Sequence, residues 1–453
     1  MAREVDVTLD PTGASGDPGV LPNAASPKRS SAQSGTFGGD PMESAPLLRR
    51  RLPFSVVAKP SGAACNLDCD YCFFLSKELL YDVPRQQMSE ETLERFVIEY
   101  LAASSDGDVT MLWQGGEPTL RGLAFFERLI DLCEAYRRPA QRVHHAVQTN
   151  ATLITDEWAA FFAKNDVLVG VSIDGPEHLH DAYRTNKAKR GTYRMVERGW
   201  RTLQEHGVRC NVLCTVNAAN QNHGREVYRH LRALGARYMQ FIPIVERVEA
   251  DLLAQAECGW RASDGTRILY TQSGQAVTSR SVDSMSYGRF LNEVFDEWLA
   301  NDVGTVFVQD FDAALASLFG YPSVCVHSAE CGLNFAMEFN GDVYACDHWV
   351  EPDWLVGNIM EDSVAELAET PVMRRFAEKK CDQLTAQCRA CPYVQLCWGG
   401  CPKDRFVNSA SGESGHNYLC AGYTEFYRHT LDTLTHMAWA IQDGGTAADA
   451  VVS

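Results

Sequence analysis

The chain lacks any apolar run long enough to cross a membrane as a helix. Its first 50 residues are rich in Pro, Gly, Ser and Ala and lack the apolar stretch of a secretory signal. Arg49-Arg50-Arg51 loosely resembles a twin-arginine signal, but Lys59-Pro60 interrupts the apolar segment that follows it. We therefore expect a disordered tail over residues 1–50 and a soluble, cytoplasmic protein with no membrane partner.

Positive charge is also in short supply. The chain carries 41 basic and 59 acidic residues, which gives a formal net charge of −18. A surface of this sign repels polyanions, so nucleic acid and anionic membranes are excluded as expected partners. A protein or a small molecule is the favoured substrate.

Cysteine is too sparse for a disulfide scaffold, with 16 residues in a chain of 453. The cysteines nevertheless occur in local groups, which indicates metal ligation in a reducing compartment. The length and the 45% content of hydrophobic residues suffice for one large α/β barrel and a smaller second module.

Short apolar runs rich in β-branched residues predict the strands of a parallel sheet. They cover residues 54–58, 109–113, 144–149, 167–173, 209–216 and 238–244, with segments of helical periodicity between them. One such helix is expected after Ser89, its N-cap, with an apolar face formed by Leu93, Phe96, Val97, Tyr100 and Leu101. The alternation predicts a partial (β/α)6 barrel with its active site at the C-terminal ends of the strands.

The predicted domains follow from changes in composition along the chain. Residues 51–245 are expected to form the barrel, and residues 246–324 an insertion and linking helices. Within the latter, residues 246–285 lack periodicity, whereas 287–300 regain a helical pattern. From Cys325 the cysteine density rises, so residues 325–440 are expected to form a cysteine-rich module with a C-terminal helix, followed by a disordered tail over 441–453.

Cys65, Cys69 and Cys72 form the most informative group. Their spacing, C-x3-C-x2-C, suits three thiolate ligands of a cubane iron–sulfur cluster, which leaves one iron without a protein ligand. The loop that carries them follows the first predicted strand, at the catalytic end of the barrel. A zinc site or a group of small buried hydrophobes is the alternative, but zinc normally takes a fourth ligand and none lies nearby in the sequence.

Polar motifs follow the next three strands. Gly115 and Gly116, with Glu117 after them, would let the backbone approach a ligand closely beside a carboxylate, with a simple turn as the alternative. The other segments are Gln148-Thr149-Asn150, Ser172-Ile173-Asp174-Gly175-Pro176, His180-Asp181 and Arg184. Each is typical of a cap or turn when taken alone, but all are expected on one rim of the barrel.

Eight cysteines near the C-terminus form a second group, with the pattern C-x2-C-x5-C-x3-C over residues 388–401. Eight thiolates suffice for two fully ligated iron–sulfur clusters, and two four-cysteine zinc sites are the alternative. The group consists of Cys325, Cys331, Cys346, Cys388, Cys391, Cys397, Cys401 and Cys420.

The first group resembles the signature of radical S-adenosylmethionine (SAM) enzymes, and Gly115 to Pro118 matches their GGEP motif. The second group resembles the SPASM domain. Together with Gln240-Phe241-Ile242 and Tyr344-Ala345-Cys346-Asp347, these motifs resemble the anaerobic sulfatase-maturating enzymes over residues 54–440. The resemblance implies three [4Fe-4S] clusters, SAM as cofactor, and oxidation of a Cys or Ser side chain in a sulfatase precursor to Cα-formylglycine.

The resemblance also implies roles for individual residues. Cys65, Cys69 and Cys72 would ligate the cluster that binds SAM. The auxiliary ligands would interleave, as Cys325, Cys331, Cys346 and Cys401 in one set and Cys388, Cys391, Cys397 and Cys420 in the other. Contacts with SAM would come from Tyr71, Gly115, Gly116, Glu117, Ser172, Arg184 and Val245. Phe74 departs from the family pattern, since relatives can carry Tyr there.

The expected partners are a sulfatase precursor segment of the C/S-x-P/A-x-R type and an electron donor such as flavodoxin or ferredoxin. Both are implied by the resemblance to the sulfatase-maturating enzymes. The sequence leaves open whether the target is Cys or Ser, which sulfatase and which reductant are used, the oligomeric state, and the roles of residues 1–50 and 246–285.

Asp347 would act as the proton acceptor by the same resemblance, and the chemistry favours it. A Cys or Ser side chain that has lost a Cβ hydrogen atom becomes a thioaldehyde or aldehyde only when one proton and one electron also leave. A carboxylate beside the cluster ligand Cys346 would place a base next to an electron acceptor. The alternative is a hydrogen bond that supports a cluster ligand. His348 would share this work or simply pack.

Two other functions stay open on the sequence alone. One is a SPASM maturase that modifies a different ribosomally made peptide, because the cysteine pattern would be shared. The other is a noncatalytic iron–sulfur electron-transfer or zinc-scaffold protein, against which the GGEP motif beside an open-iron triad argues.

Overall fold

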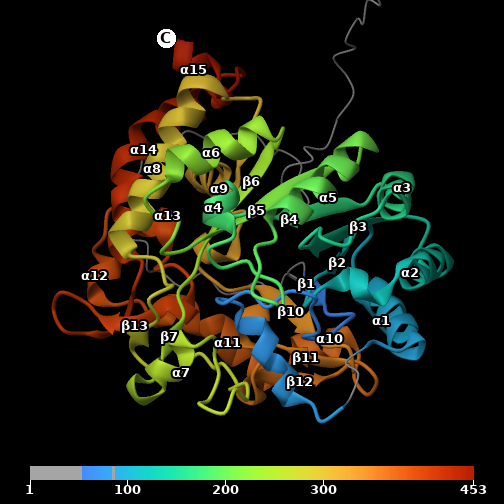
Figure 1. Ribbon diagram of the computed structural model, residues 1–453. Coiled ribbons are helices and arrows are strands. Elements are labelled where there is room, and N and C mark those ends of the chain that lie inside the picture. The colour runs from blue at the N-terminus through green and yellow to red at the C-terminus, as the bar shows by residue number, and fades with distance from the viewer. Residues whose placement is uncertain (1–53, 84–86, 453) are drawn as a thin grey trace, which may run out of the picture.

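The parallel strands predicted from the apolar runs form the wall of a partial barrel. The computed structural model describes residues 54–83 and 87–452, so the tail predicted over residues 1–50 lies outside the described part. Neighbouring strands pair in parallel in the order in which they occur in the chain. They are β1 (Phe54–Ala58), β2 (Gly107–Trp113), β3 (Gln141–Thr149), β4 (Leu168–Ser172), β5 (Cys210–Val216) and β6 (Tyr238–Pro243). The predicted barrel is confirmed (Figure 1).

Helices cover the outside of this curved sheet (Figure 1). They are α1 (Glu90–Ala103), α2 (Leu123–Tyr136), α3 (Asp156–Lys164), α4 (Glu177–His180), α5 (Tyr193–Glu205) and α6 (Gly224–Ala233). The Ser89 hydroxyl caps α1 by accepting the Thr92 N–H at 3.0 Å. The predicted apolar face of α1 is at most 2% exposed. Each large side chain buried there contributes about 1.5–3 kcal/mol, which holds the helix on the sheet.

The sheet continues beyond the barrel on both sides. β10 (Leu333–Met337) runs parallel to β1, and β11 (Asp342–Tyr344) and β12 (Leu355–Asn358) follow it in antiparallel order. On the opposite side, β9 (Phe307–Val308) joins β6. Figure 1 shows orange β10 beside blue β1, although Ser55 and its partner Asn334 are 279 residues apart. The strands after Cys325, expected in a separate module, therefore extend the barrel sheet.

Residues 246–285, expected as part of an insertion without clear periodicity, form a small ordered unit. β7 (Arg247–Val248) pairs with β8 (Ala276–Val277), with η3 (Ala250–Leu252) and α7 (Leu253–Glu257) between them. A separate apolar cluster, made of Val248, Ala256, Trp260 and Tyr270, fills this unit. Two longer helices follow, α8 (Ser284–Asn301) and α9 (Gln309–Leu318), and α8 confirms the helix predicted over 287–300.

Short elements dominate the cysteine-rich region. They are η4 (Cys325–His327), η5 (Asp347–Trp349), η6 (Pro352–Trp354), α10 (Val364–Ala368), α11 (Pro371–Asp382), α12 (Ala386–Arg389), α13 (Val394–Cys397), η7 (Pro402–Asp404), and the hairpin of β13 (Arg405–Asn408) and β14 (Ser414–Asn417). The long α14 (Cys420–Gln442) then packs against α8 and α9. Gly422 permits this approach, because a Cβ there would lie 2.1 Å from the Ser284 carbonyl oxygen.

The disordered tail expected over residues 441–453 is not observed in its described part. α14 continues to Gln442, and a further short helix, α15 (Asp449–Val452), follows it. Asp449 accepts the Thr446 N–H at 2.7 Å, which caps α15. Ala447 and Ala450 pack against the main hydrophobic core. Tertiary packing therefore orders a segment whose composition alone suggested disorder.

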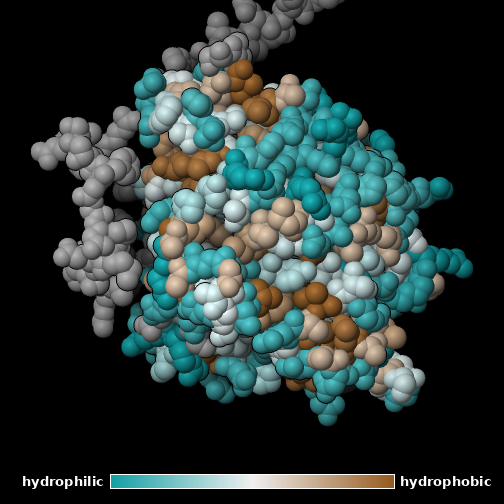
Figure 2. All heavy atoms as spheres, turned by 90° about the vertical axis from the view of Figure 1, so that its left-hand side faces the viewer, coloured by the Kyte–Doolittle hydropathy of each residue, from teal (hydrophilic) through white to brown (hydrophobic). Residues whose placement is uncertain are grey.

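The outer surface is predominantly hydrophilic where α14 and α12 face the solvent. Figure 2 shows apolar residues on this face in separate patches between hydrophilic ones. Among the described helices, none combines the length and the apolar character needed to cross a bilayer.

Candidate active site

The first three cysteines lie in one loop between β1 and η1 (Phe73–Leu80). Their thiols lie close together. Burial raises the pKa of Cys69, and the neighbouring thiols of Cys72 and Cys65 raise it further, whereas Arg184 lowers it. All 16 cysteines of the chain are free of disulfides. Three free thiols beside a buried guanidinium fit the ligand set of an anionic iron–sulfur cluster.

The segment after β3 braces this loop. Asn150 donates its side-chain amide to Asn66 Oδ1 at 2.9 Å and to Cys65 Sγ at 3.7 Å. Gln148 donates to Ser172 Oγ at 3.1 Å. The polar motifs after β1, β3 and β4 are therefore in contact on one rim, as the sequence predicts.

The two glycines of the GGEP motif pack directly on the cysteine loop. Gly116 N–H donates to the Gly62 carbonyl at 2.9 Å, and a Cβ at Gly116 would lie 2.0 Å from the Ala64 carbonyl oxygen. Gly115 has a φ of +142°, and a Cβ there would lie 3.3 Å from Lys59 Cδ. The close approach of the two loops therefore requires glycine, whatever ligand the motif also contacts.

Glu117 is fully buried, and donors of the protein itself occupy its carboxylate. Oε1 accepts the Thr119 N–H at 3.1 Å, the Thr119 hydroxyl at 2.6 Å and the Thr149 hydroxyl at 2.7 Å. Oε2 accepts the Asn150 N–H at 2.8 Å. The observed role of this side chain is to tie η2 (Pro118–Arg121) to the end of β3. Its contact with SAM stays a prediction.

Tyr71, Asp174 and Arg184 form a closed network on the same rim. The Tyr71 hydroxyl and Arg184 Nε both donate to Asp174 Oδ2, at 2.5 and 2.8 Å. Thr215 N–H donates to the other carboxylate oxygen at 2.9 Å. Burial disfavours the charged form of Arg184, but Asp174 and Tyr71 hold the pKa of its guanidinium well above the usual value. Val245 lies in the loop after β6, 5% exposed and packed in the main core.

The first predicted auxiliary set gathers around η4 and η5. Burial raises the pKa of Cys346, and the thiols of Cys325 and Cys401 raise it further. The fully buried Lys380 lies beside this set and donates to the carbonyls of Cys325 and Val326. A buried cation favours the thiolate form that a metal ligand requires. The members are Cys325, Cys331, Cys346 and Cys401.

The second auxiliary set lies between α12 and the start of α14. Burial raises the pKa of Cys420, as do the thiols of Cys388 and Cys391. Arg405 stands between the two sets: burial lowers the pKa of its guanidinium, and thiols of both sets oppose that change. The members are Cys388, Cys391, Cys397 and Cys420.

Neighbouring thiols are those that the resemblance assigns to the same ligand set, and the assignment of each set to one cluster stays a prediction. Within the described ranges, no group of three or more His, Cys, Asp or Glu side chains is arranged to hold a single metal ion. The fit to clusters accordingly rests on the chemistry of the donors, on the membership of each set, and on the buried cations beside them.

Asp347 is the first residue of a turn that ends at Glu351. This turn contacts residues at both ends of the cysteine loop. Lys59, the residue after β1, forms an ion pair with Asp347 Oδ1. Phe73, the residue after Cys72, packs with its ring 5.8 Å from that of His348. Burial alone would raise the pKa of Asp347, but Lys59 and His348 bring it below the usual value. Burial lowers the pKa of His348 to about 4, so this ring packs as a neutral imidazole.

Three buried charged residues near this turn were not predicted from the sequence. Lys59 and Lys77 are each 1% exposed, and Glu338 is also 1% exposed. Lys59 Nζ lies 4.5 Å from the ring centroid of Phe74, which gives the aromatic side chain at this position a cation–π role. A lysine directly after a buried apolar strand is the sequence feature that could indicate Lys59. From the sequence, Lys59-Pro60 is interpreted only as an interruption of the apolar run.

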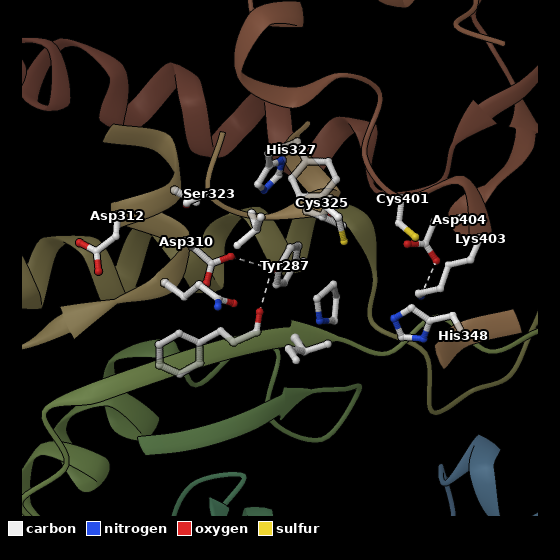
Figure 3. Close-up of a pocket in the computed structure, with 18 of the residues that line it drawn as sticks. Tyr287, Asp310, Asp312, Ser323, Cys325, His327, His348, Cys401, Lys403 and Asp404 are labelled. Carbon is white, nitrogen blue, oxygen red and sulfur yellow. Dashed lines mark hydrogen bonds and ion pairs between the residues drawn. The ribbon is translucent and has the colours of Figure 1, made fainter. Parts of the chain in front are cut away.

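A cavity of about 290 Å3 separates the first auxiliary set from the end of β6. Figure 3 shows Cys325 and Cys401 on one side of it, His348 and Lys403 at one end, and Asp310 near Tyr287. Burial raises the pKa of Asp310 to about 7. The cavity extends from the thiols of Cys325 and Cys401 to His348, the residue next to Asp347.

Family models match both halves of this site. The Radical SAM superfamily matches residues 60–231, and SPASM, an iron-sulfur cluster-binding domain, matches residues 331–392. Fold and site together therefore define a radical SAM oxidoreductase with an iron–sulfur SPASM domain. Streptococcus suis SuiB with bound S-adenosylmethionine shares this fold, with a TM-score of 0.53 at 16% identity over 81% of this chain and 77% of that one.

More similar proteins identify the family. The chain is 39% identical over 389 residues to a serine-type anaerobic sulfatase-maturating enzyme of Bacteroides thetaiotaomicron, covering 85% of this chain and 91% of the relative. It is 31% identical over 394 residues to a cysteine-type enzyme of Clostridium perfringens (strain 13 / Type A), covering 85% and 98%. Native anSMEcpe with bound AdoMet has a TM-score of 0.73 at 31% identity, covering 85% and 99%. This chain belongs to the anaerobic sulfatase-maturating enzyme family.

Proposed function

We propose that this enzyme oxidises a Cys or Ser side chain of a sulfatase precursor to Cα-formylglycine. The observation that carries the proposal is the position of the Asp347 turn. Its ion pair with Lys59 and the contact of His348 with Phe73 hold it against the loop of the cysteine triad. A base and a radical-generating site would then face the same target residue.

The cofactors of this reaction would be three [4Fe-4S] clusters and SAM. Cys65, Cys69 and Cys72 would ligate one cluster, and the two auxiliary sets the others. When bound, these groups supply a 5′-deoxyadenosyl radical that removes a Cβ hydrogen atom, and an acceptor for the electron that is left over. SAM would be oriented by Tyr71, Glu117, Ser172, Arg184, Val245 and the backbone at Gly115 and Gly116.

Asp347 would take the S–H or O–H proton of the target. Lys59 keeps its carboxylate ionised, and therefore able to accept a proton, although the Asp347 side chain is 20% exposed. His348 would support the turn by packing on Phe73.

The partner would be a polypeptide segment of the C/S-x-P/A-x-R type. This proposal is supported by a structure of the relative anSMEcpe that contains a Cp18Cys peptide along with AdoMet, with a TM-score of 0.73 at 30% identity. An electron donor such as flavodoxin or ferredoxin, a cytoplasmic location, and the absence of nucleic-acid and membrane partners complete the proposal.

Mass spectrometry of matched C-x-P-x-R and S-x-P-x-R peptides, after anaerobic incubation with reconstituted enzyme, SAM and a reductant, tests it. We expect the Ser peptide to lose two hydrogens, and the Cys peptide to lose two hydrogens and exchange sulfur for oxygen. Both products should react with a carbonyl probe. A modified peptide that does not react with the probe would instead support a maturase that cross-links or oxidises other peptides.

A further inference from the structure

Two buried lysines flank the cysteine triad in the sequence, and both reach the same turn. Lys59 precedes the triad and pairs with Asp347, at the first residue of the turn. Lys77 follows the triad, and its Nζ lies 3.8 Å from Glu351 Oε1, at the last residue of the turn. Since each lysine is 1% exposed, each is held inside the protein and not at its surface.

Lys59 is fixed by contacts that do not involve the turn. Its N–H donates to the Met337 carbonyl at 2.8 Å, and its ammonium lies 4.5 Å from the centroid of the Phe74 ring. The side-chain stem runs beside Gly115, where any Cβ would approach Lys59 Cδ to 3.3 Å. The ammonium therefore has a defined position before it meets Asp347.

Lys77 is fixed in a similar way from the other side. Its Nζ donates to the Tyr270 carbonyl at 2.7 Å. Burial lowers the pKa of this lysine to about 8, and the carboxylates of Glu351, Asp347 and Glu338 oppose the change. The residue is therefore a buried cation close to two buried acids, Glu338 and Glu351, and to the partly buried Asp347.

Residues 246–285 also contact the turn. The Gln272 N–H donates to Glu351 Oε1 at 2.7 Å, and the Gln272 side chain donates to the His348 carbonyl at 3.3 Å. The lysines thus connect the turn to the segments before and after the cysteine triad. The small unit after β6 contacts the same turn through Gln272.

We propose that Lys59 and Lys77 are positioning residues that hold the turn from Asp347 to Glu351 at a fixed distance from the cysteine triad. The inference rests on the proposed role of Asp347. Without either lysine, a buried carboxylate would lose its cation and move toward water, because an uncompensated buried charge is strongly unfavourable. The base would then no longer meet the target residue where its hydrogen atom is removed.

Glu338 distinguishes the two lysines. The register of β1 with β10 pairs Ala58 with Met337, so Lys59 and Glu338 are the next residues of adjacent strands. Lys59 pairs directly with Asp347 and also lies close to the carboxylate of Glu338, whereas Lys77 pairs directly with Glu351 and has a weaker, longer-range effect on Asp347. Loss of Lys59 should consequently have the larger effect.

The test is the ratio of formylglycine formed to SAM cleaved, measured on reconstituted enzyme. For Lys59→Met we expect this ratio to fall about ten-fold or more, and for Lys77→Met about two- to five-fold, because a base displaced by a small distance loses catalysis steeply. Lys59→Arg should recover part of the ratio, since it keeps the charge. A loss of folded enzyme alone would lower product and SAM cleavage together and leave the ratio unchanged.

Lys189→Met is the matched control. Lys189 pairs with Asp68 and Asp70 of the cysteine loop, at 3.1 and 2.7 Å, but its side chain is 54% exposed and it does not reach the turn. An exposed pair of this kind contributes about 0–1 kcal/mol, so we expect a wild-type ratio.

Hydrogen exchange of the same variants gives a second readout that does not depend on product. Peptides that cover residues 346–352 should exchange faster in Lys59→Met and Lys77→Met than in Lys189→Met. Wild-type exchange of the turn in both variants would overturn the inference, as would an unchanged product ratio. Wild-type enzyme that cleaves SAM but forms no formylglycine would instead refute the proposed function, and the exchange comparison would still decide the positioning role.

Discussion

The part of the site proposed to bind SAM and the part proposed to hold the base are built from different kinds of contact, and we call them the SAM side and the base side. On the SAM side, the carboxylate of Asp174 accepts hydrogen bonds from Tyr71, Arg184 and Thr215. Both of its oxygens are bonded, and one cation, Arg184, balances its charge. On the base side, two buried lysines face three acidic residues. Within the described residues, Glu338 Oε1 is buried without a hydrogen-bond partner.

This difference suits the two proposed roles, which are binding of a cofactor and acceptance of a proton. A site that binds a cofactor benefits from a fully satisfied polar network, because such a network is rigid and prearranged. A site that receives a proton needs an ionised carboxylate, and the ion pair with Lys59 lowers the pKa of Asp347. The comparison therefore predicts that changes on the SAM side reduce binding and cleavage of SAM, whereas changes on the base side reduce conversion of the target residue.

The largest effect is expected when the cysteine triad is removed. Replacing Cys65, Cys69 and Cys72 together with Ala should abolish SAM cleavage and remove about a third of the iron, because one cubane of three would be lost. Iron analysis and detection of 5′-deoxyadenosine measure both quantities. Retained SAM cleavage in this variant would break the assignment of the SAM side.

Arg184→Lys should have the next largest effect. A lysine cannot reproduce the planar group that bonds Asp174 and Thr215 together, so we expect SAM affinity to fall about ten-fold with iron content unchanged. Equilibrium binding of SAM measures this loss.

Arg194→Lys is its control, because that side chain is 83% exposed and pairs with Glu177 on the surface. If Arg184→Lys kept its SAM affinity and lost only product formation, the division between the two sides would be wrong.

Glu338→Gln should have the smallest effect on the reaction, and its effect on stability should depend on pH. Burial raises the pKa of Glu338 from its usual value of 4.5 to about 7, an increase that Lys59 partly offsets. Between these values the folded protein keeps a proton that the unfolded chain releases, so stability falls as pH rises and levels off above about pH 7. Gln cannot ionise, so relative to wild type the variant should gain up to about 3 kcal/mol between pH 4.5 and 8. Thermal unfolding across this range measures the difference, and parallel pH profiles would contradict it.

Local regularity accounts for the parts of the fold that could be predicted. The apolar runs that became β1 to β6, the Ser89 cap and the helix now labelled α8 each carry their signal within a few neighbouring residues. The pairing of β10 with β1 does not, since it joins strands at opposite ends of the chain. The same limitation explains the missed order of α15, which is stabilised by packing and not by its own sequence.

The site divides in the same way. Spacing identified the triad and the eight auxiliary cysteines, but their interleaving came from family resemblance, because spacing does not say which thiols meet in space. Lys59, Lys77 and Glu338 have no motif of their own. Their importance follows from β10 lying beside β1, which brings the Asp347 turn to the cysteine loop.

The most direct test of the account is the Asp347→Asn variant, with formylglycine and 5′-deoxyadenosine measured in the same reaction. Asn keeps the size of the side chain and some hydrogen bonding but cannot take the proton. We predict a full complement of iron, continued SAM cleavage, and a fall in formylglycine of about 10²-fold or more. If product, SAM cleavage and iron fell in parallel, Asp347 would only support the cluster ligand Cys346. Normal iron with nearly wild-type product would rule Asp347 out as the base.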